Sequence, residues 1–185
     1  MKVLVVVDMQ NDFIDGALGT EEAKAIVPKV VQKIREFDGF VITTQDAHGD
    51  NYLETQEGKN LPVPHCIYGT NGYLLRDEVH RAVEAKPMNT MFIKETFGCA
   101  SLALWLDNYD SGLMNTVGEE IEEVVLVGLC TDICVISNAM LLKAFLPEVP
   151  ITVDASCCAG VTPESHKNAL NAMRMCQIRI VGEDE

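Results

Sequence analysis

Six short apolar runs recur along the chain and predict buried β-strands. Each run is rich in Val, Ile or Thr and is bounded by charged residues, glycine or proline. Near-continuous apolar runs of this kind are typical of parallel strands that are covered on both faces. The runs lie at residues 2–8, 39–46, 89–95, 122–128, 150–155 and 176–182.

Between the runs, apolar residues recur with helical spacing. Within residues 27–37 they follow the i, i+3, i+4, i+7 pattern, and we expect Pro28 in the first turn of this helix, where a missing N–H is tolerated. A second helix is expected at 101–109 with Ser101 as its N-cap. Two more are predicted: a largely apolar one at 132–146, and one at 163–175 that follows Thr162 as cap and Pro163 as first residue.

Strands that alternate with helices predict a doubly wound α/β domain. We expect three α/β/α layers with a mostly parallel sheet of about six strands. The chain has no evident internal repeat or linker, so residues 1–185 are predicted to form a single domain. One long irregular segment remains, at residues 47–72, and a loop of that length in a compact domain is usually functional or disordered.

Composition narrows the class of protein. Apolar residues make up 48% of the 185 positions, which argues against disorder. The net charge of −14 argues against a nucleic-acid partner, and no run reaches the length of a membrane span. The first apolar run ends in Asp8 instead of a small-residue cleavage site, so we interpret it as a strand, not a signal peptide. A cytoplasmic location with reduced thiols follows, and seven irregularly spaced cysteines agree with it.

Chemically active residues stand at the ends of the predicted strands. Ligands of open α/β sheets bind outside the carboxyl ends of the strands, so residues there share one rim. Each residue alone has an ordinary structural explanation, as a loop cap, a solvated lysine or a buried thiol. Their convergence on one rim favours a functional site made of Asp8, Asp46, His48, Lys94, Cys130 and Cys134.

Three of these side chains have complementary chemistry. Cys134 would lie in the first turn of its helix, where the helix N-terminus and a nearby cation such as Lys94 should lower the pKa of the thiol. A carboxylate such as Asp8 can take the thiol proton and later give it to a leaving amine. Backbone N–H groups at the helix start can bind an oxyanion. The trio predicts acyl transfer through a thioester.

Asp46, His48 and His65 form a second group. Nitrogen and oxygen ligands of this kind suit Zn, Mn or Fe, and three ligands leave positions open for water or substrate. The fourth ligand is left open between Glu54, Glu57 and water. Asp-x-His alone is a weak signal, and a loop histidine is usually structural.

The other cysteines and histidines carry less signal. No paired C-x-x-C spacing occurs, so a structural zinc site is not expected. Cys130 and Cys134 could still form a redox pair instead of one nucleophile and a bystander. His80 and His166 are expected to face solvent from helix surfaces. The other cysteines are expected to be structural: Cys66, Cys99, Cys157, Cys158 and Cys176.

Five blocks occur in order and cover most of the chain: "VVVDMQNDF", "TTQDAH", "PHCIYGTNGY", "FIKETFG" and "VGLCTDICV". Together they closely resemble the isochorismatase-like cysteine hydrolases and, within them, the nicotinamidases. The resemblance implies the isochorismatase-like hydrolase fold. It also implies that Asp8 is the general base, Lys94 the catalytic lysine and Cys134 the nucleophile. The Leu129–Cys130 peptide would be cis, and the N–H groups of Cys130 and Cys134 would form the oxyanion hole.

The resemblance further implies a metal site. Asp46, His48 and His65 match the ligands of a divalent ion, and Glu57 has about the spacing of a fourth ligand. In the family this ion binds the pyridine nitrogen of the substrate. Zn is the expected ion, with Mn or Fe as alternatives. Phe13 matches an aromatic residue that lines the substrate pocket. Family members often have a Trp near the metal loop, whereas the only Trp of this chain, Trp105, lies on a predicted helix.

The expected activity is hydrolysis of nicotinamide, or a close aromatic amide, to the acid and ammonia, which would serve NAD salvage. The binding partner expected for this activity is the small amide substrate. Oligomers are common among relatives, so a homo-oligomer is also expected. One alternative is a cysteine hydrolase of carbamoyl or ureido compounds, whose members keep the trio and lack the metal ligands. Another is a non-catalytic binding protein or a thiol redox protein on the same fold. Isochorismatase activity is less expected, because vinyl-ether hydrolysis does not require the thiol.

Overall fold

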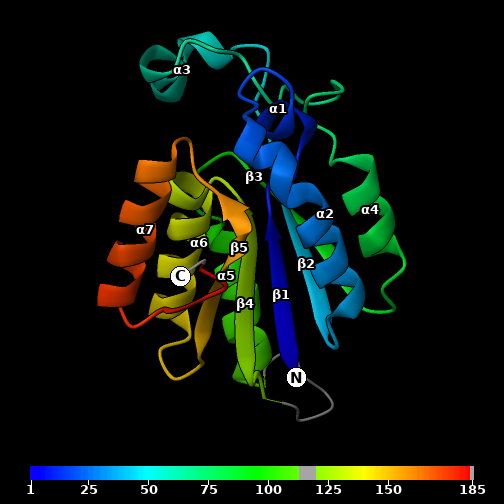
Figure 1. Cartoon of the computed structure of the whole chain (residues 1–185), viewed down its shortest axis with the longest axis vertical. Helices are drawn as coiled ribbons and strands as arrows, with labels where there is room; N and C mark the ends of the chain where they lie inside the picture. Colours follow the sequence, from blue (N-terminus) through cyan, green and yellow to red (C-terminus); the bar gives the residue numbers. More distant parts are fainter. Residues whose placement is uncertain (113–119, 184–185) are drawn as a thin grey trace.

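The computed structural model describes residues 1–112 and 120–183, which form a six-stranded sheet between two layers of helices (Figure 1). The strand order is β3-β2-β1-β4-β5-β6, and each neighbouring pair is parallel. The expected fold is therefore confirmed, with a sheet that is parallel throughout the described residues. The strands are β1 (Lys2–Val7), β2 (Phe40–Asp46), β3 (Asn89–Lys94), β4 (Glu123–Leu129), β5 (Ile151–Ala159) and β6 (Arg179–Val181).

Strand β1 shows why the apolar runs become central strands. All five residues from Val3 to Val7 have no solvent exposure, because helices cover both faces of the sheet. Val3, Val5 and Val7 point into one core cluster, whereas Leu4 and Val6 point into the other. Each such side chain contributes about 1.5–3 kcal/mol relative to an exposed one.

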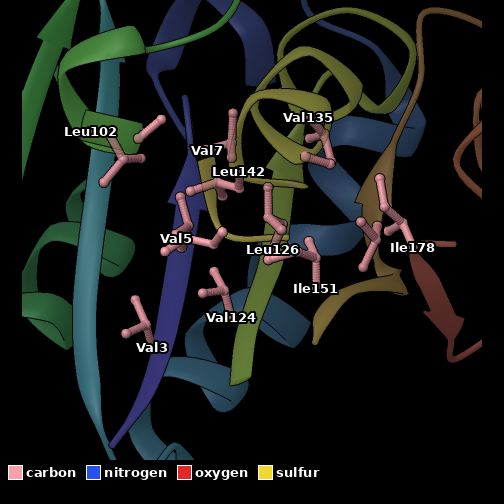
Figure 2. Close-up of a cluster of buried hydrophobic side chains, with 14 of the residues drawn as sticks. Val3, Val5, Val7, Leu102, Val124, Leu126, Val135, Leu142, Ile151 and Ile178 are labelled. Carbon is pink, nitrogen blue, oxygen red and sulfur yellow. The ribbon is translucent and has the colours of Figure 1, made fainter. Parts of the chain in front are cut away.

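The helices divide between the two faces. α2 (Glu21–Glu36) and α4 (Asp77–Glu84) pack on one core cluster. α5 (Ala100–Asp110), α6 (Ile136–Phe145) and α7 (Pro163–Met175) pack on the other. Figure 2 shows that second cluster, which contains Leu102 of α5 and Leu142 of α6 together with side chains of β1 and β4.

Pro28 lies inside α2, so its predicted position in the first turn was wrong. The helix begins earlier, because the Thr20 side chain accepts the N–H of Ala23 at 3.0 Å and caps it. Pro28 is exposed, so the carbonyl of Lys24 that loses its helical donor can be hydrated. Burial of the opposite face of α2 offsets the cost of an interior proline, about 3 kcal/mol.

Helix α5 begins at Ala100 after Cys99, so Ser101 is not its N-cap as we predicted. Asn138 of α6 accepts the N–H of Cys99 at 2.9 Å and takes over the role of a cap. The apolar helix predicted at 132–146 is two segments, a π-helical turn η2 (Thr131–Val135) followed by α6. Thr162 caps α7 as predicted, accepting the N–H of Ser165 at 3.0 Å.

The long segment at residues 47–72 lies over the carboxyl ends of the strands, beside α1 (Asn11–Ile14) (Figure 1). It contains a 3-10 turn η1 (Tyr52–Glu54) and a short helix α3 (Gln56–Asn60). Chain order reverses between β1 and β4, which is where open α/β sheets bind ligands. In the described residues, no helix is both long enough and apolar enough to cross a bilayer.

Candidate active site

Asp8, Lys94 and Cys134 meet at the carboxyl end of the sheet. Asp8 directly follows β1, Lys94 is the last residue of β3, and Cys134 lies in η2 beyond β4. Lys94 Nζ lies 2.7 Å from Asp8 Oδ2 and 3.6 Å from Cys134 Sγ. All three are at most 5% exposed. The fold thus brings together three residues that the sequence separates widely.

The carboxyl group of Asp8 is held from one side. Thr44 Oγ1 donates to Asp8 Oδ1 at 2.6 Å, and the backbone N–H of Asp8 donates to the Thr44 carbonyl at 3.2 Å. The other oxygen, Oδ2, is buried and has no aligned hydrogen-bond donor among the described residues, although its ion pair with Lys94 is short. Oδ2 is therefore the oxygen that can accept a proton.

Burial dominates the electrostatics of the trio. It raises the pKa of Asp8, which Lys94 partly opposes. It also raises the pKa of Cys134 well above its usual value, and the Asp8 carboxylate adds to this while Lys94 opposes it. Our expectation of a lowered thiol pKa was wrong, because desolvation outweighs the cation. Burial lowers the pKa of Lys94, but charge interactions with Asp8, Cys134 and Asp46 raise it by more, so the ammonium stays charged.

The resting site is accordingly a neutral thiol beside a carboxylate and an ammonium. Transfer of the thiol proton to Asp8 moves the negative charge to sulfur without changing the net charge of the buried site. Lys94 contacts both groups and so stabilises either state. The arrangement supports a thiolate that forms only when Asp8 takes the proton.

Several hydrogen bonds hold the turn that carries Cys134. The Leu129–Cys130 peptide is cis, as the resemblance implied. The carbonyl of Cys130 accepts the N–H groups of Ile133 and Val135 at 3.1 and 3.0 Å. Asp132 accepts the N–H of Val161 at 3.1 Å, which joins the turn to the end of β5.

Asn138 is a positioning residue that our sequence reasoning missed. Its Nδ2 donates to the Cys134 carbonyl at 2.8 Å, while its Oδ1 accepts the N–H of Cys99 at 2.9 Å. The side chain is 1% exposed, so both contacts are buried. A lone amide within an apolar helical stretch was the available signal.

His166 is only partly exposed to solvent, whereas His80 is exposed as predicted. His166 Nδ1 lies 2.8 Å from Thr131 Oγ1 in η2, the turn that carries Cys134. The half-buried ring of His166 lies near the start of α7. Burial lowers the pKa of His166, and Asp132 opposes that effect. The contact with Thr131 accounts for the partial burial of His166, because η2 packs against α7.

A second cluster contains Asp46, His48, Glu57 and His65, whose ligand atoms all lie within 4.8 Å of one another. His48 Nε2 is 2.9 Å from Asp46 Oδ2. Glu57 Oε1 lies 3.6 Å from His48 Nε2 and 3.7 Å from His65 Nε2. Glu54 is not part of the cluster, so the geometry selects Glu57 over Glu54 as a further ligand.

The donors of this cluster converge on a common point. His48 Nε2 is buried and has no aligned hydrogen-bond partner among the described residues, despite its closeness to Asp46. His65 Nδ1 bonds to the Val63 carbonyl at 2.9 Å, which leaves Nε2 free to ligate. Burial raises the pKa of Asp46, but its contacts with His48, His65 and Lys94 bring it well below the usual range. Two nitrogen and two oxygen donors fit a divalent transition metal.

Gln10 is the second positioning residue that sequence reasoning missed. Its side chain donates to the carbonyls of Asp46 and Tyr73 at 2.8 and 2.7 Å, and accepts the N–H of Asp46 at 2.8 Å. Asp12 also holds the backbone of this region, because its side chain accepts the N–H of Cys66 at 2.8 Å. These bonds fix the backbone on which Asp46 and His65 stand.

A cavity of about 710 Å³ joins the two groups. Cys134, Asp46 and His65 line it, and Lys94 Nζ contacts Asp46 Oδ1 at 3.3 Å between them. Phe13 also lines it, with its ring centroid 5.4 Å from that of His65. Cys130 lines it too, and burial raises the pKa of its thiol to about 12.

Residues outside the cavity keep their structural roles. Trp105 packs on Phe40 and Phe92, at centroid distances of 5.6 and 5.9 Å, within the α5 layer. All seven cysteines are free thiols, so Cys130 and Cys134 form no disulfide here.

Comparison with known proteins agrees with this geometry. The isochorismatase domain family matches residues 2–184. A nicotinamidase/pyrazinamidase of Mycobacterium tuberculosis is 28% identical over 98% of this chain and 98% of that protein. The crystal structure of a pyrazinamidase/nicotinamidase from Streptococcus mutans superposes with a TM-score of 0.80 at 26% identity, covering 98% of this chain and 100% of that one. A pyrazinamidase of Pyrococcus horikoshii in complex with zinc gives 0.72 at 25% identity, covering 98% and 99%.

Proposed function

The chain belongs to the isochorismatase domain family, and from this premise we propose that it is a cysteine amidohydrolase that converts nicotinamide to nicotinate and ammonia. One observation carries the proposal: Lys94 Nζ contacts Asp8, Cys134 and Asp46, so a buried thiol and its base adjoin the metal-ligand cluster. Cys134 and the ligands Asp46, Glu57 and His65 line one cavity. The relatives that act on nicotinamide or pyrazinamide support the choice of substrate.

In the first step, Asp8 takes the proton of Cys134 as sulfur attacks the amide carbon. A carbon–sulfur bond forms and the carbonyl oxygen becomes an oxyanion, which the backbone N–H groups of Cys130 and Cys134 are expected to bind. Asp8 then gives its proton to the amide nitrogen, the carbon–nitrogen bond breaks, and ammonia leaves. The product on the enzyme is a thioester.

In the second step, the carboxylate of Asp8 takes a proton from water, and the resulting hydroxide attacks the thioester. The carbon–sulfur bond breaks, the acid is released, and the thiol of Cys134 recovers its proton. Lys94 keeps the site neutralised throughout, because it contacts whichever of Asp8 and Cys134 is negative. The sum is one amide and one water giving one acid and one ammonia.

Asp46, His48, Glu57 and His65 are the residues that would hold a divalent metal ion. When bound, that ion supplies a Lewis-acid contact for the pyridine nitrogen. Zinc is the proposed metal, with Mn and Fe as alternatives, because two imidazoles and two carboxylates suit it and a related pyrazinamidase was crystallised with zinc. Elemental analysis of purified protein, followed by chelation and reconstitution, identifies the ion.

The test is release of ammonia from nicotinamide by the metal-loaded enzyme. We expect turnover in the wild type, none in Cys134→Ser, and normal turnover in the surface control Cys176→Ser. Cys130→Ser should retain activity, because only the backbone of Cys130 is assigned a role. Absence of turnover by metal-loaded wild type would refute the proposal, and equal damage from the two site variants would favour a thiol redox pair.

The competing activities have less support. Hydrolases of carbamoyl or ureido compounds need no metal ligands, yet four donors converge here and His48 Nε2 has no other aligned partner among the described residues. A non-catalytic binding protein would not require a carboxylate positioned to accept the thiol proton. Protein without bound metal that cleaves a carbamoyl compound would reverse this ranking.

We also propose that residues 1–185 form one domain that acts in the cytoplasm in NAD salvage and assembles as a homo-oligomer. Light scattering after size-exclusion chromatography tests the assembly. Nicotinate accumulation in cells with and without the protein tests the role, and fractionation of those cells tests the location.

A further inference from the structure

The cavity is larger than the substrate proposed for it. Nicotinamide is a single ring with one amide group, whereas sites that hold drug-sized ligands enclose about 300–1,000 Å³. The cavity, at about 710 Å³, falls in the latter class. Cys134, Asp46 and His65 occupy one part of its lining and account for the reacting amide and the ring. Much of the remaining volume has no assigned occupant.

Apolar side chains from separate segments form the outer wall of this cavity. Leu61 follows α3, Phe97 follows β3, and Val161 follows β5. They are 37%, 48% and 51% exposed, respectively, so each presents a large apolar surface to solvent. Three exposed apolar side chains around one cavity favour an apolar ligand group that covers them.

The charges of the lining exclude one class of ligand. Asp46 and Glu57 are proposed metal ligands, so Glu95 is the unassigned charge of the lining, and none of the described lining residues is Lys or Arg. An anionic group away from the metal ligands would be repelled by Glu95 and would find no Lys or Arg on the wall as a counter-ion. The outer region therefore fits a neutral apolar group.

We propose that this outer region, defined by Leu61, Phe97 and Val161, binds a neutral apolar substituent on the ring of the amide. The preferred substrates are then ring-substituted nicotinamides, with nicotinamide itself a smaller and poorer substrate. The inference rests on the proposed amidohydrolase function and adds to it the substrate class and the residues that determine it.

A substrate panel tests the inference. It contains nicotinamide, nicotinamides with a propyl group at each free ring carbon in turn, and the matching carboxyethyl compounds. We expect the best propyl compound to exceed nicotinamide in kcat/KM by about tenfold, the lower end of what added apolar groups contribute in a fitted pocket. The carboxyethyl compound with the same attachment should be no better than nicotinamide.

Variants assign the effect to the outer region. Phe97→Ser should lower the ratio of propyl to unsubstituted kcat/KM by about tenfold, whereas Leu104→Ser, a similarly exposed position on α5, should leave the ratio unchanged. Calorimetry with the inactive Cys134→Ala variant should give the same order of binding constants. Circular dichroism checks that each variant is folded.

The outcomes separate the two proposals. Turnover of nicotinamide with no propyl compound better than it would overturn the inference and leave the function intact. A carboxyethyl compound equal to its propyl counterpart would also overturn it. No ammonia from any compound would overturn the function itself.

Discussion

Replacement of Asn138 by Ala removes two buried hydrogen bonds at once. One joins its amide to the Cys134 carbonyl at 2.8 Å, and the other joins it to the N–H of Cys99 at 2.9 Å. Cys134 is 5% and Cys99 2% exposed, so water cannot readily replace the lost partner. A buried polar group left unpaired costs about 1–3 kcal/mol, so the two together predict a loss of about 2–6 kcal/mol in the free energy of unfolding.

Such a loss is a large share of the roughly 5–15 kcal/mol that holds an ordinary domain folded. Urea unfolding should show a lower midpoint with an unchanged m-value, because the native surface hardly changes. The Cys134 turn also loses an anchor, and small displacements of a nucleophile are costly in rate. We therefore expect kcat for nicotinamide to fall by about tenfold or more, measured where the variant is still fully folded.

Asn171→Ala is the matched control, because Asn171 is exposed on α7 and its side chain accepts a hydrogen bond from Arg174 of the same helix. The free energy of unfolding of this variant should differ from that of the wild type by no more than about 0.5 kcal/mol. If Asn138→Ala keeps both the wild-type midpoint and the wild-type kcat, the reasoning about the two buried contacts is refuted.

Three further predictions concern the metal-ligand cluster and the nucleophile turn. Gln10→Leu should weaken metal binding by about 10–100-fold in a competition titration with a chromogenic chelator, since it frees the backbone of Asp46; unchanged affinity would contradict this. In the same titration Glu57→Gln should weaken binding and Glu54→Gln should not, and equal effects would contradict the selection of Glu57. The pKa of His166 in the folded protein is lowered below its ordinary value of 6.5. Near and below that pH the unfolded chain therefore binds more protons than the folded protein does, and the free energy of unfolding should fall as the pH is lowered from 7.5 to 5. His166→Gln should flatten that part of the profile in urea titrations at each pH, and an unaltered slope would exclude His166 as its source.

Much of the fold could be predicted because its causes are local. The apolar runs that became β1, β2, β4 and β5 are nearly continuous, and only a sheet covered on both faces buries them so completely. The proximity of Asp8, Lys94 and Cys134 followed from one rule, that the carboxyl ends of parallel strands share an edge. The grouping of His65 with Asp46 and His48 had weaker support from the residues alone, because nothing in its loop sequence fixes where the loop folds.

What could not be predicted depends on contacts between distant segments. Asn138 and Gln10 act through hydrogen bonds to residues whose positions are set by other strands, so their own neighbours in the sequence are uninformative. The direction of the Cys134 pKa depended on how completely the thiol is buried, which outweighs the cation beside it. Pro28 was misplaced for a different and local reason, because α2 begins at the Thr20 cap and not beside the proline.

Lys94 stands on an edge strand of the sheet. In the described part of the chain β3 is bonded to β2 alone, and every second residue from Asn89 to Ile93 is exposed. Edge strands open locally at a lower free energy than the strands at the centre of a sheet. A brief opening of β3 would withdraw the ammonium from Asp8 and Cys134 while β1 and β4 stay in place. The enzyme should therefore lose activity at a lower denaturant concentration than the one that unfolds its core.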